Sequence, residues 1–208
     1  MKTWAVVPVK SFEQAKSRLA SVLSAEERRA LIERLLRDTL DTIAGVEAIE
    51  TTLVVSGDPA ARGLARRRHA RVLDEGPTLD LNLALHRATR LARRHRVARV
   101  LILPADLPLL TSDDVRALLA AAPEPPSLVI APDRHTSGTN ALLIAPPGLI
   151  EYAFGIGSFS HHRERALAAG AQVAVCERPG LALDLDAPED LALLQAQSHP
   201  AAWPQPSE

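Results

Sequence analysis

The chain has 208 residues, of which 47% are hydrophobic and 3% aromatic, and its formal net charge is −1. This length suits one domain with a full core, and the apolar content excludes a largely disordered chain. The balanced charge argues against a nucleic-acid or membrane partner, and the basic clusters at 66–69 and 93–96 are explained as the ends of helices. Apolar runs of four to six residues and a single cysteine lead us to expect a cytoplasmic protein.

Strands and helices are predicted to alternate through the first 120 residues. The apolar runs at 4–9, 52–55, 71–73 and 99–103 are typical of buried strands. Helices are expected over 24–43, with a capping box of Ser24 and Glu27, from Pro59, from a Thr78 cap and from a Thr111 cap. This alternation predicts a mostly parallel sheet flanked by helices in one Rossmann-like α/β domain.

The rest of the chain continues the same domain. Strands are expected at 128–131, 141–145 and 173–176, and helices at 159–169 and from Pro188. The domain is assigned to residues 1–197. Residues 198–208, rich in Pro, Ala and Gln, are expected to form a loose tail.

Three aspartates stand out as candidate metal ligands. Asp106 follows the strand at 99–103, and the carboxyl ends of parallel strands are where such sheets bind ligands. Asp184 and Asp186 alternate with leucines, which places both carboxylates on one face of an extended segment. Oxygen ligands without histidine or cysteine suit Mg²⁺. The alternative reading is that Asp184 faces solvent and Asp186 caps the helix that begins near Pro188.

The loop after the first strand is a candidate phosphate site. Only three of the 24 basic side chains are lysines, and two of them, Lys10 and Lys16, lie in this loop with Arg18. Together these three could hold a triphosphate. The chain lacks the glycine-rich patterns of a P-loop and of a dinucleotide fold. Two further turns, at 137–140 and 155–158, could present hydroxyls or backbone N–H groups to an anion, or could be ordinary flexible turns.

No hydrolase triad can be assembled from these residues. The chain has no nucleophile elbow, and Cys176 lies in an apolar strand where a core position is expected. Adjacent residues on a helix point about 100° apart, so at most one of His161 and His162 can face a ligand. A zinc site is therefore not expected.

Five separate motifs resemble one family, the CofC-type guanylyltransferases of deazaflavin coenzyme F-420 biosynthesis, over about residues 4–194. The motifs are Pro8-Val9-Lys10 with Lys16, Arg18 and Leu19; residues 103–108; residues 131–135 with 138–142; Phe154-Gly155 with Gly157-Ser158-Phe159 and His162; and Asp184-Leu185-Asp186 with residues 188–191.

The resemblance implies a nucleotidyltransferase fold akin to molybdenum-cofactor guanylyltransferases and sugar-nucleotide pyrophosphorylases. It implies metal ligands at Asp106, Asp184 and Asp186. It implies contacts to a phosphorylated acid at Thr139, Gly155 and Ser158. It also implies that Asn82 lies near the guanine and ribose. Lys10, Lys16 and Arg18 are expected, from their charge and their place in the first loop, to stabilise charge on the nucleotide phosphates.

Two departures from related patterns bear on the acceptor. The first loop, glycine-rich in the cousin families, reads Pro8-Val9-Lys10 here. Where the family commonly has His-Gly-Thr-Gly-Thr-Asn, this chain has Thr136 in place of the first glycine. The second change lies at the mouth of the implied acid-binding loop and leaves the identity of the acid open.

The expected reaction is transfer of GMP from GTP, with Mg²⁺, to a small phosphorylated acid. The resemblance implies phosphoenolpyruvate for bacterial members and 2-phospho-L-lactate for archaeal ones; 3-phosphoglycerate is a further alternative. A downstream transferase and a homodimer are also expected from the family. Two other functions stay open: a nucleotidyltransferase for molybdopterin or a sugar phosphate, and a non-catalytic nucleotide sensor.

Overall fold

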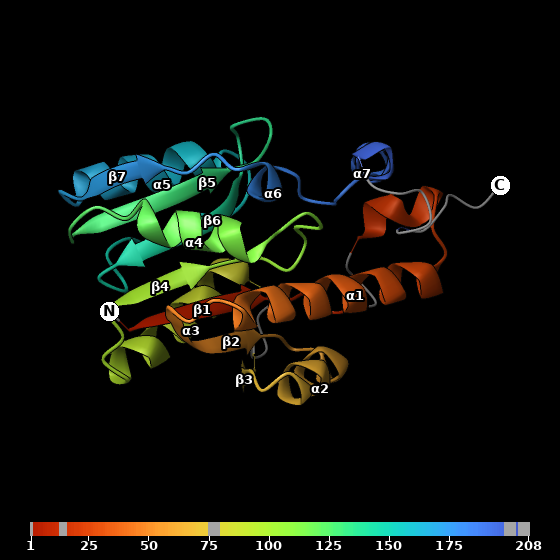
Figure 1. Cartoon of the computed structure of the whole chain (residues 1–208), viewed down its shortest axis with the longest axis horizontal. Helices are drawn as coiled ribbons and strands as arrows, with labels where there is room; N and C mark the ends of the chain where they lie inside the picture. The colour runs from red at the N-terminus through yellow and green to blue at the C-terminus, as the bar shows by residue number, and fades with distance from the viewer. Residues whose placement is uncertain (1, 13–15, 75–79, 198–202, 204–208) are drawn as a thin grey trace.

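A seven-stranded sheet forms the centre of the computed structural model, which describes residues 2–12, 16–74, 80–197 and 203. The strand order is β3-β2-β1-β4-β6-β5-β7 (Figure 1). The strands are β1 (Thr3–Pro8), β2 (Ile49–Val55), β3 (Arg71–Leu73), β4 (Arg99–Ile102), β5 (Ser127–Pro132), β6 (Thr139–Ala145) and β7 (Gln172–Val175). Every neighbouring pair is parallel except those of β6. The predicted mostly parallel sheet is confirmed.

Strand β6 runs antiparallel to both of its neighbours, β4 and β5. Only residues 133–138 separate β5 from β6, and a connection this short forms a hairpin, whereas a parallel crossover needs a dozen residues or more. The start of β6 therefore lies at the same edge of the sheet as the carboxyl ends of β4 and β5. This reversal brings Thr139 to the edge where ligands are expected.

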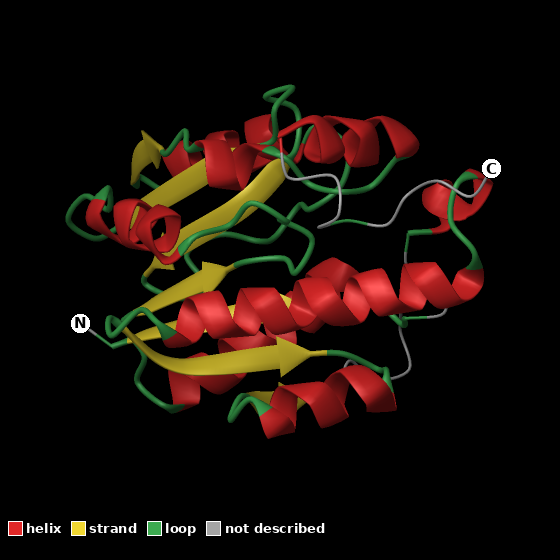
Figure 2. Ribbon diagram, turned by 45° about the vertical axis from the view of Figure 1, so that its right-hand side comes forward, coloured by secondary structure: helices red, strands yellow, loops and turns green. Residues whose placement is uncertain are grey.

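Helices cover both faces of the sheet (Figure 2). They are α1 (Ala25–Ala44), α2 (Pro59–Arg67), α3 (Leu81–Arg94), α4 (Ser112–Ala120), α5 (Ser158–Ala168), α6 (Pro179–Ala182) and α7 (Pro188–Gln197), with a 3-10 helix η1 (Ser17–Ser21). One core cluster joins α1, α2 and α4 to side chains such as Ala5 and Val7. The opposite cluster joins α3 and α5 to Trp4 and Val6. The alternation within β1 thus feeds both cores.

The predicted helix starts at Ser24, Pro59, Thr111 and Pro188 were right, and the predicted cap at Thr78 was wrong. Ser24 with Glu27, and Thr111 with Asp114, form reciprocal capping boxes. Helix α3, however, is capped by Asp80, whose carboxylate accepts hydrogen bonds from the amides of its second and third following residues. Thr78 itself lies outside the described residues. An aspartate at this place caps as well as threonine does, and it lies closer to the amphipathic run.

A third apolar cluster joins η1, the start of α1, α7 and Leu183 and Leu185. Trp203 belongs to it, is 8% exposed, and lies under the Arg34 guanidinium at 4.1 Å. At this residue the predicted loose tail is wrong, because the indole is packed against the domain. The other residues of that tail lie outside the described part of the chain.

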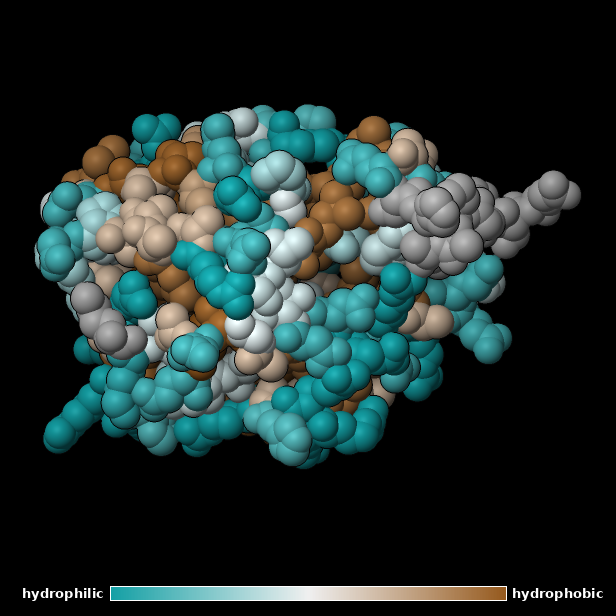
Figure 3. Space-filling view, in the orientation of Figure 1, coloured by the Kyte–Doolittle hydropathy of each residue, from teal (hydrophilic) through white to brown (hydrophobic). Residues whose placement is uncertain are grey.

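The surface over helices α1 and α2 is mainly polar (Figure 3). Figure 3 shows hydrophilic side chains over α1 and α2, on the faces turned away from the sheet. Each helix in the described ranges is too short or too polar to span a membrane. Cys176 follows β7 instead of lying within it, yet it is 7% exposed, so the predicted core position is confirmed.

Candidate functional site

A lysine bridges two of the three predicted metal ligands. The Lys16 ammonium lies 3.0 Å from Asp106 Oδ2 and 2.7 Å from Asp186 Oδ1, and its side chain is only 9% exposed. Asp106 follows β4, Lys16 follows β1, and Asp186 lies between α6 and α7. Three segments distant in sequence therefore meet around one buried cation.

Backbone contacts explain how these segments are held together. The Leu185 amide donates to the Asp106 carbonyl oxygen at 3.0 Å, which fastens the two acidic segments to each other. Leu185 is fully buried and packs in the third cluster with Leu19 of η1. Lys16 adopts a left-handed backbone (φ 56°) at the start of η1, so the chain turns sharply there. The apolar side chains thus anchor the segments that present the charged ones.

The charges around Lys16 shift several pKa values. Burial alone would lower the pKa of Lys16, but the Asp106 and Asp186 carboxylates outweigh it, and the pKa is raised. Burial opposes ionisation of Asp186, yet Lys16, and then Arg18 and Lys10, hold its pKa below the usual value. The ion pair between Lys16 and Asp186 therefore favours the charged form of each of these two groups.

Asp184 has the opposite character. Burial, followed by the negative charges of Asp106 and Asp186, raises its pKa. Lys16 makes no ion pair with it, so this carboxylate carries charge that its surroundings disfavour. Among the described residues no group of three or more acidic, histidine or cysteine side chains is arranged to hold a metal ion. The Lys16 ammonium bridges two of the three candidate ligands instead.

The alternative role for Asp186, as a helix cap, is wrong. The amides of Asp186 and Ala187 donate to Asp190 Oδ2 at 2.9 and 2.7 Å, so Asp190 closes the start of α7. Asp190 is also paired with Arg134. The Asp186 carboxylate is turned toward Lys16.

Asn140 belongs to the candidate turn at 137–140, but no role was predicted for its side chain. Its Nδ2 donates to the carbonyl oxygens of Leu181 and Ala182 at 2.9 and 3.2 Å, and lies 3.4 Å from Asp184 Oδ1. It is 7% exposed. The side chain therefore fastens the end of α6, and the Asp184 that follows it, to β6. The available signal was an asparagine within an apolar strand, where a buried amide must find partners.

The implied acid ligands come from two elements that touch. Thr139 begins β6 and Ser158 begins α5, and both are buried, at 7% and 1% exposed. The Phe159 amide donates to the Ser137 carbonyl at 3.2 Å, and the Ser158 amide to the Gly155 carbonyl at 3.1 Å. The two amides at the start of α5 are thus already hydrogen-bonded within the protein. Fewer backbone N–H groups are therefore left for the anion predicted at this turn.

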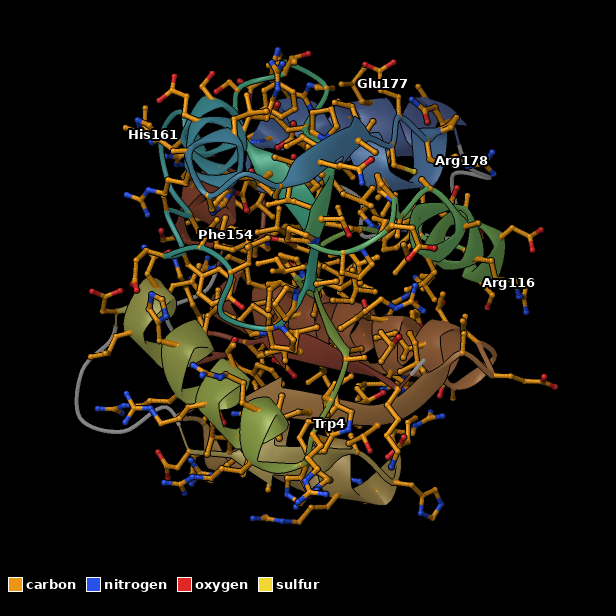
Figure 4. All side chains as sticks on the ribbon, turned by 90° about the vertical axis from the view of Figure 1, so that its left-hand side faces the viewer. Trp4, Arg116, Phe154, His161, Glu177 and Arg178 are labelled. Carbon is orange, nitrogen blue, oxygen red and sulfur yellow. The ribbon has the colours of Figure 1, made fainter. Side chains whose placement is uncertain are left out.

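The two neighbouring histidines have different environments. Figure 4 shows His161 at the outer surface and Phe154 nearer the middle of the molecule. His162 is fully buried; its Nδ1 lies 3.0 Å from Thr139 Oγ1, and its Nε2 accepts from the Ala153 amide at 3.0 Å. Burial, then the charges of Arg165 and His161, lowers the pKa of His162 to about 4. The His162 ring is therefore neutral and is held in place by both of its nitrogens. The two histidine side chains lie in different environments and do not form a pair of ligands.

Asn82 is engaged with the backbone that precedes Gly155. The Phe154 amide donates to Asn82 Oδ1 at 2.8 Å, and Asn82 Nδ2 donates to the Phe154 carbonyl at 3.2 Å. The residue thus connects α3 to the segment that enters the implied acid-binding turn. Its contact to a nucleotide stays a prediction.

Thr136 occupies a backbone conformation that suits glycine. Its φ is 56°, in the left-handed region. The turn around it is held by the Asp133 carboxylate, which accepts from the amides of His135 and Ser137. A β-branched side chain is strained in this region, so the departure from the family pattern stores strain at the loop.

Acidification should destabilise the fold through His162. Its folded-state pKa of about 4 lies below the ordinary 6.5, so the unfolded chain binds more protons between these values. The stability is fully present above pH ~6.5 and is lost as the pH falls toward ~4. Chemical denaturation at pH 7.5 and pH 5.0 should therefore show a loss from this group of about 2 kcal/mol. The non-titrating His162→Gln variant should show a shallower dependence; an equal dependence would contradict the assignment.

Replacing Thr136 with glycine should stabilise the protein. Relief of left-handed strain contributes about 1–2 kcal/mol, and the added freedom of the unfolded glycine offsets about 0.4–1 kcal/mol. A net gain of about 0.5–1 kcal/mol in denaturant unfolding is expected. Thr136→Ala, which keeps a Cβ, is the control and should gain less. A destabilised glycine variant would mean that the threonine side chain makes a compensating contact.

Comparison with known proteins places this geometry in a family. A family model described as "Guanylyl transferase CofC like" matches residues 3–198. The phosphoenolpyruvate guanylyltransferase of Rubrobacter xylanophilus is 48% identical over 197 residues, covering 94% of this chain and 95% of the relative. The enzyme of the same name from Sphaerobacter thermophilus is 42% identical over 191 residues, covering 92% and 91%.

Solved structures agree at the level of the fold. A 4-diphosphocytidyl-2C-methyl-D-erythritol synthase superposes with a TM-score of 0.66 at 14% identity, covering 94% of this chain and 98% of that chain. A cytidylyltransferase from Leptospira borgpetersenii serovar Hardjo-bovis gives a TM-score of 0.62 at 12% identity, covering 94% and 86%. With nearly the whole chain matched by the family model, the protein is a nucleotidyltransferase and belongs to the CofC-like guanylyltransferase family.

Proposed function

We propose that this protein transfers GMP from GTP to the phosphate of phosphoenolpyruvate and releases pyrophosphate. The observation that carries the proposal is the buried Lys16 ammonium between Asp106 and Asp186, at the sheet edge where Thr139 also lies. The names of the 48% and 42% identical relatives support the same acceptor.

The three aspartates fit a magnesium ion by their chemistry. All supply hard oxygen ligands. The pKa of Asp184 is raised by burial and then by Asp106 and Asp186, as expected for a carboxylate with which Lys16 does not pair. We propose that Asp106, Asp184 and Asp186 hold Mg²⁺. When bound, this ion would neutralise phosphate charge and help to align the two reacting groups.

The proposed step forms one bond and breaks one. An oxygen of the acceptor phosphate attacks the α-phosphorus of GTP, and the bond from that phosphorus to the bridging oxygen of the β-phosphate breaks. Pyrophosphate leaves with the electron pair. A phosphate monoester has its second pKa near ~6, so the attacking oxygen is already ionised at neutral pH. No side chain is needed as a general base.

The loop after β1 supplies positive charge for the nucleotide phosphates. Lys10 and Arg18 are exposed at the edge, and both act on Asp186 through their charge. With Lys16, they are placed to stabilise negative charge on the leaving pyrophosphate. On the acid side we assign Thr139, Gly155 and Ser158 to the acceptor, with Asn82 on the nucleoside side.

The product explains the need for a partner. A phosphate–phosphate anhydride next to an enol ester is reactive, so a transferase that consumes it is expected. We propose that this step belongs to coenzyme F-420 biosynthesis in the cytoplasm, with the protein acting as a homodimer. 2-Phospho-L-lactate and 3-phosphoglycerate are the competing acceptors.

The first test is pyrophosphate release from GTP and Mg²⁺ with each of the three acids added separately. We expect release with phosphoenolpyruvate and its loss on metal chelation. Asp106→Asn should lower kcat by about 10²–10³-fold, since it removes one metal ligand worth several kcal/mol in the transition state. Asp113→Asn, at an exposed position on α4, is the matched control and should keep wild-type turnover.

Two outcomes would overturn the proposal. Silence of the folded wild-type protein with all three acids would favour another acceptor, such as molybdopterin or a sugar phosphate, or a nucleotide sensor. Full turnover in Asp106→Asn would show that this carboxylate is not a metal ligand needed for the reaction.

Removing the Lys16 charge should tighten metal binding to the nucleotide-free protein. The ammonium competes for Asp106 and Asp186, so Lys16→Met should bind Mn²⁺ about 10-fold more tightly, measured by electron paramagnetic resonance. Turnover should fall in the same variant because a phosphate contact is lost. Lys10→Met, which removes an exposed charge, should change Mn²⁺ affinity much less. Weaker Mn²⁺ binding in Lys16→Met would contradict competition at this site.

A further inference from the structure

We propose that His162 is a positioning residue that aims the Thr139 hydroxyl at the acceptor acid and sets the backbone before Gly155. The inference rests on the proposed function, which assigns Thr139 and Gly155 to the acceptor. His162 itself is fully buried, so its role would be exerted through Thr139 and the Ala153 backbone.

The direction of each hydrogen bond follows from the backbone. The Ala153 amide can only donate, so His162 Nε2, 3.0 Å away, must accept and carries no proton. A neutral ring then has its proton on Nδ1, which donates to Thr139 Oγ1 at 3.0 Å. A hydroxyl that accepts from the ring keeps its own hydrogen for another acceptor. Thr139 is thereby set as a donor, which suits an oxygen of a phosphate or carboxylate.

The surroundings keep the ring in this form. Burial, followed by the charges of Arg165 and His161, lowers the pKa of His162 to about 4. A protonated ring would direct a second N–H at the Ala153 amide, which is also a donor. The arrangement of donors is therefore fixed throughout the neutral pH range.

One ring connects all three implied acid contacts. Ala153, whose amide donates to Nε2, lies two residues before Gly155. Asn82 holds the intervening Phe154 by accepting from its backbone N–H and donating to its carbonyl oxygen. The Phe154 ring packs edge-on against His162 with centroids 4.8 Å apart. Ser158 lies four residues before His162 in α5, on the same face of the helix.

A packing role alone would not require this arrangement. An apolar side chain could fill the same buried volume without two correctly directed hydrogen bonds, whereas a buried polar ring is costly unless both nitrogens are satisfied. Both are satisfied here, one by a β6 hydroxyl and the other by the loop backbone. The ring thus fixes how α5, β6 and the turn at Gly155 are oriented relative to one another.

Two substitutions separate the two nitrogens. His162→Asn places an amide nitrogen near Nδ1 and can still donate to Thr139. His162→Gln reaches the position of Nε2, where its oxygen can accept from Ala153, but leaves Thr139 without its donor. Each is made in the full chain, alone and combined with Thr139→Val. The KM values for phosphoenolpyruvate and GTP are then measured by pyrophosphate release.

We expect His162→Gln to raise the KM for phosphoenolpyruvate by about 10-fold, the effect of a lost hydrogen bond to a charged ligand. The KM for GTP should change less than about 2-fold, and His162→Asn should have the smaller effect on the acid. In the Thr139→Val background, His162→Gln should add less than about 2-fold, because the hydroxyl it positions is already gone.

Additive effects of His162→Gln and Thr139→Val, or equal increases in both KM values, would overturn the inference while leaving the proposed function in place. If the wild-type protein releases no pyrophosphate, both the inference and the proposed function are rejected. If the variants do not fold, nitrogen-15 NMR of the wild-type histidines decides. A proton on Nδ1 with an unprotonated Nε2 at pH 7 supports the inference, and the opposite tautomer or a charged ring rejects it.

Discussion

The site depends on how its negative charge is balanced. Three carboxylates converge at one edge of the sheet, and the buried Lys16 ammonium satisfies two of them. Asp184 is left in surroundings that disfavour its charged form. The Lys16 ammonium offsets the repulsion between these carboxylates, because a buried group of like charges would otherwise be costly. Under the proposed function, a metal ion and nucleotide phosphates would replace the Lys16 ammonium as partners of these carboxylates.

Strand direction decides which loops can share that edge. If β6 were parallel to β4 and β5, Thr139 and Asn140 would begin at the opposite edge, far from Asp106. The short hairpin after β5 reverses the chain and returns both residues to the carboxyl ends of the parallel strands. Asn140 then holds the end of α6 and fixes where Asp184 emerges. The antiparallel strand therefore joins the acidic side of the site to the implied acid-binding side.

Buried and half-buried polar side chains fix the positions of the loops around the site. Asn82, Asn140 and His162 all bond to backbone groups, so each determines the path of a loop as well as its own orientation. Such groups are costly to bury unless satisfied, and for that reason they favour one arrangement of the loops over others. Thr136, in the loop between β5 and β6, is instead strained in a left-handed conformation.

The sequence by itself determined the alternation of strands and helices, two of the helix caps, and the carboxylates that follow apolar runs, because these depend on local periodicity and neighbouring residues. Its motifs also identified the family. Only the tertiary structure decided that Lys16 bridges Asp106 and Asp186 and that His162 is buried beneath Thr139. These contacts join residues 23 to 170 positions apart. No local pattern encodes such distances, since they depend on strand order, strand direction and the packing of the leucines beneath the loops.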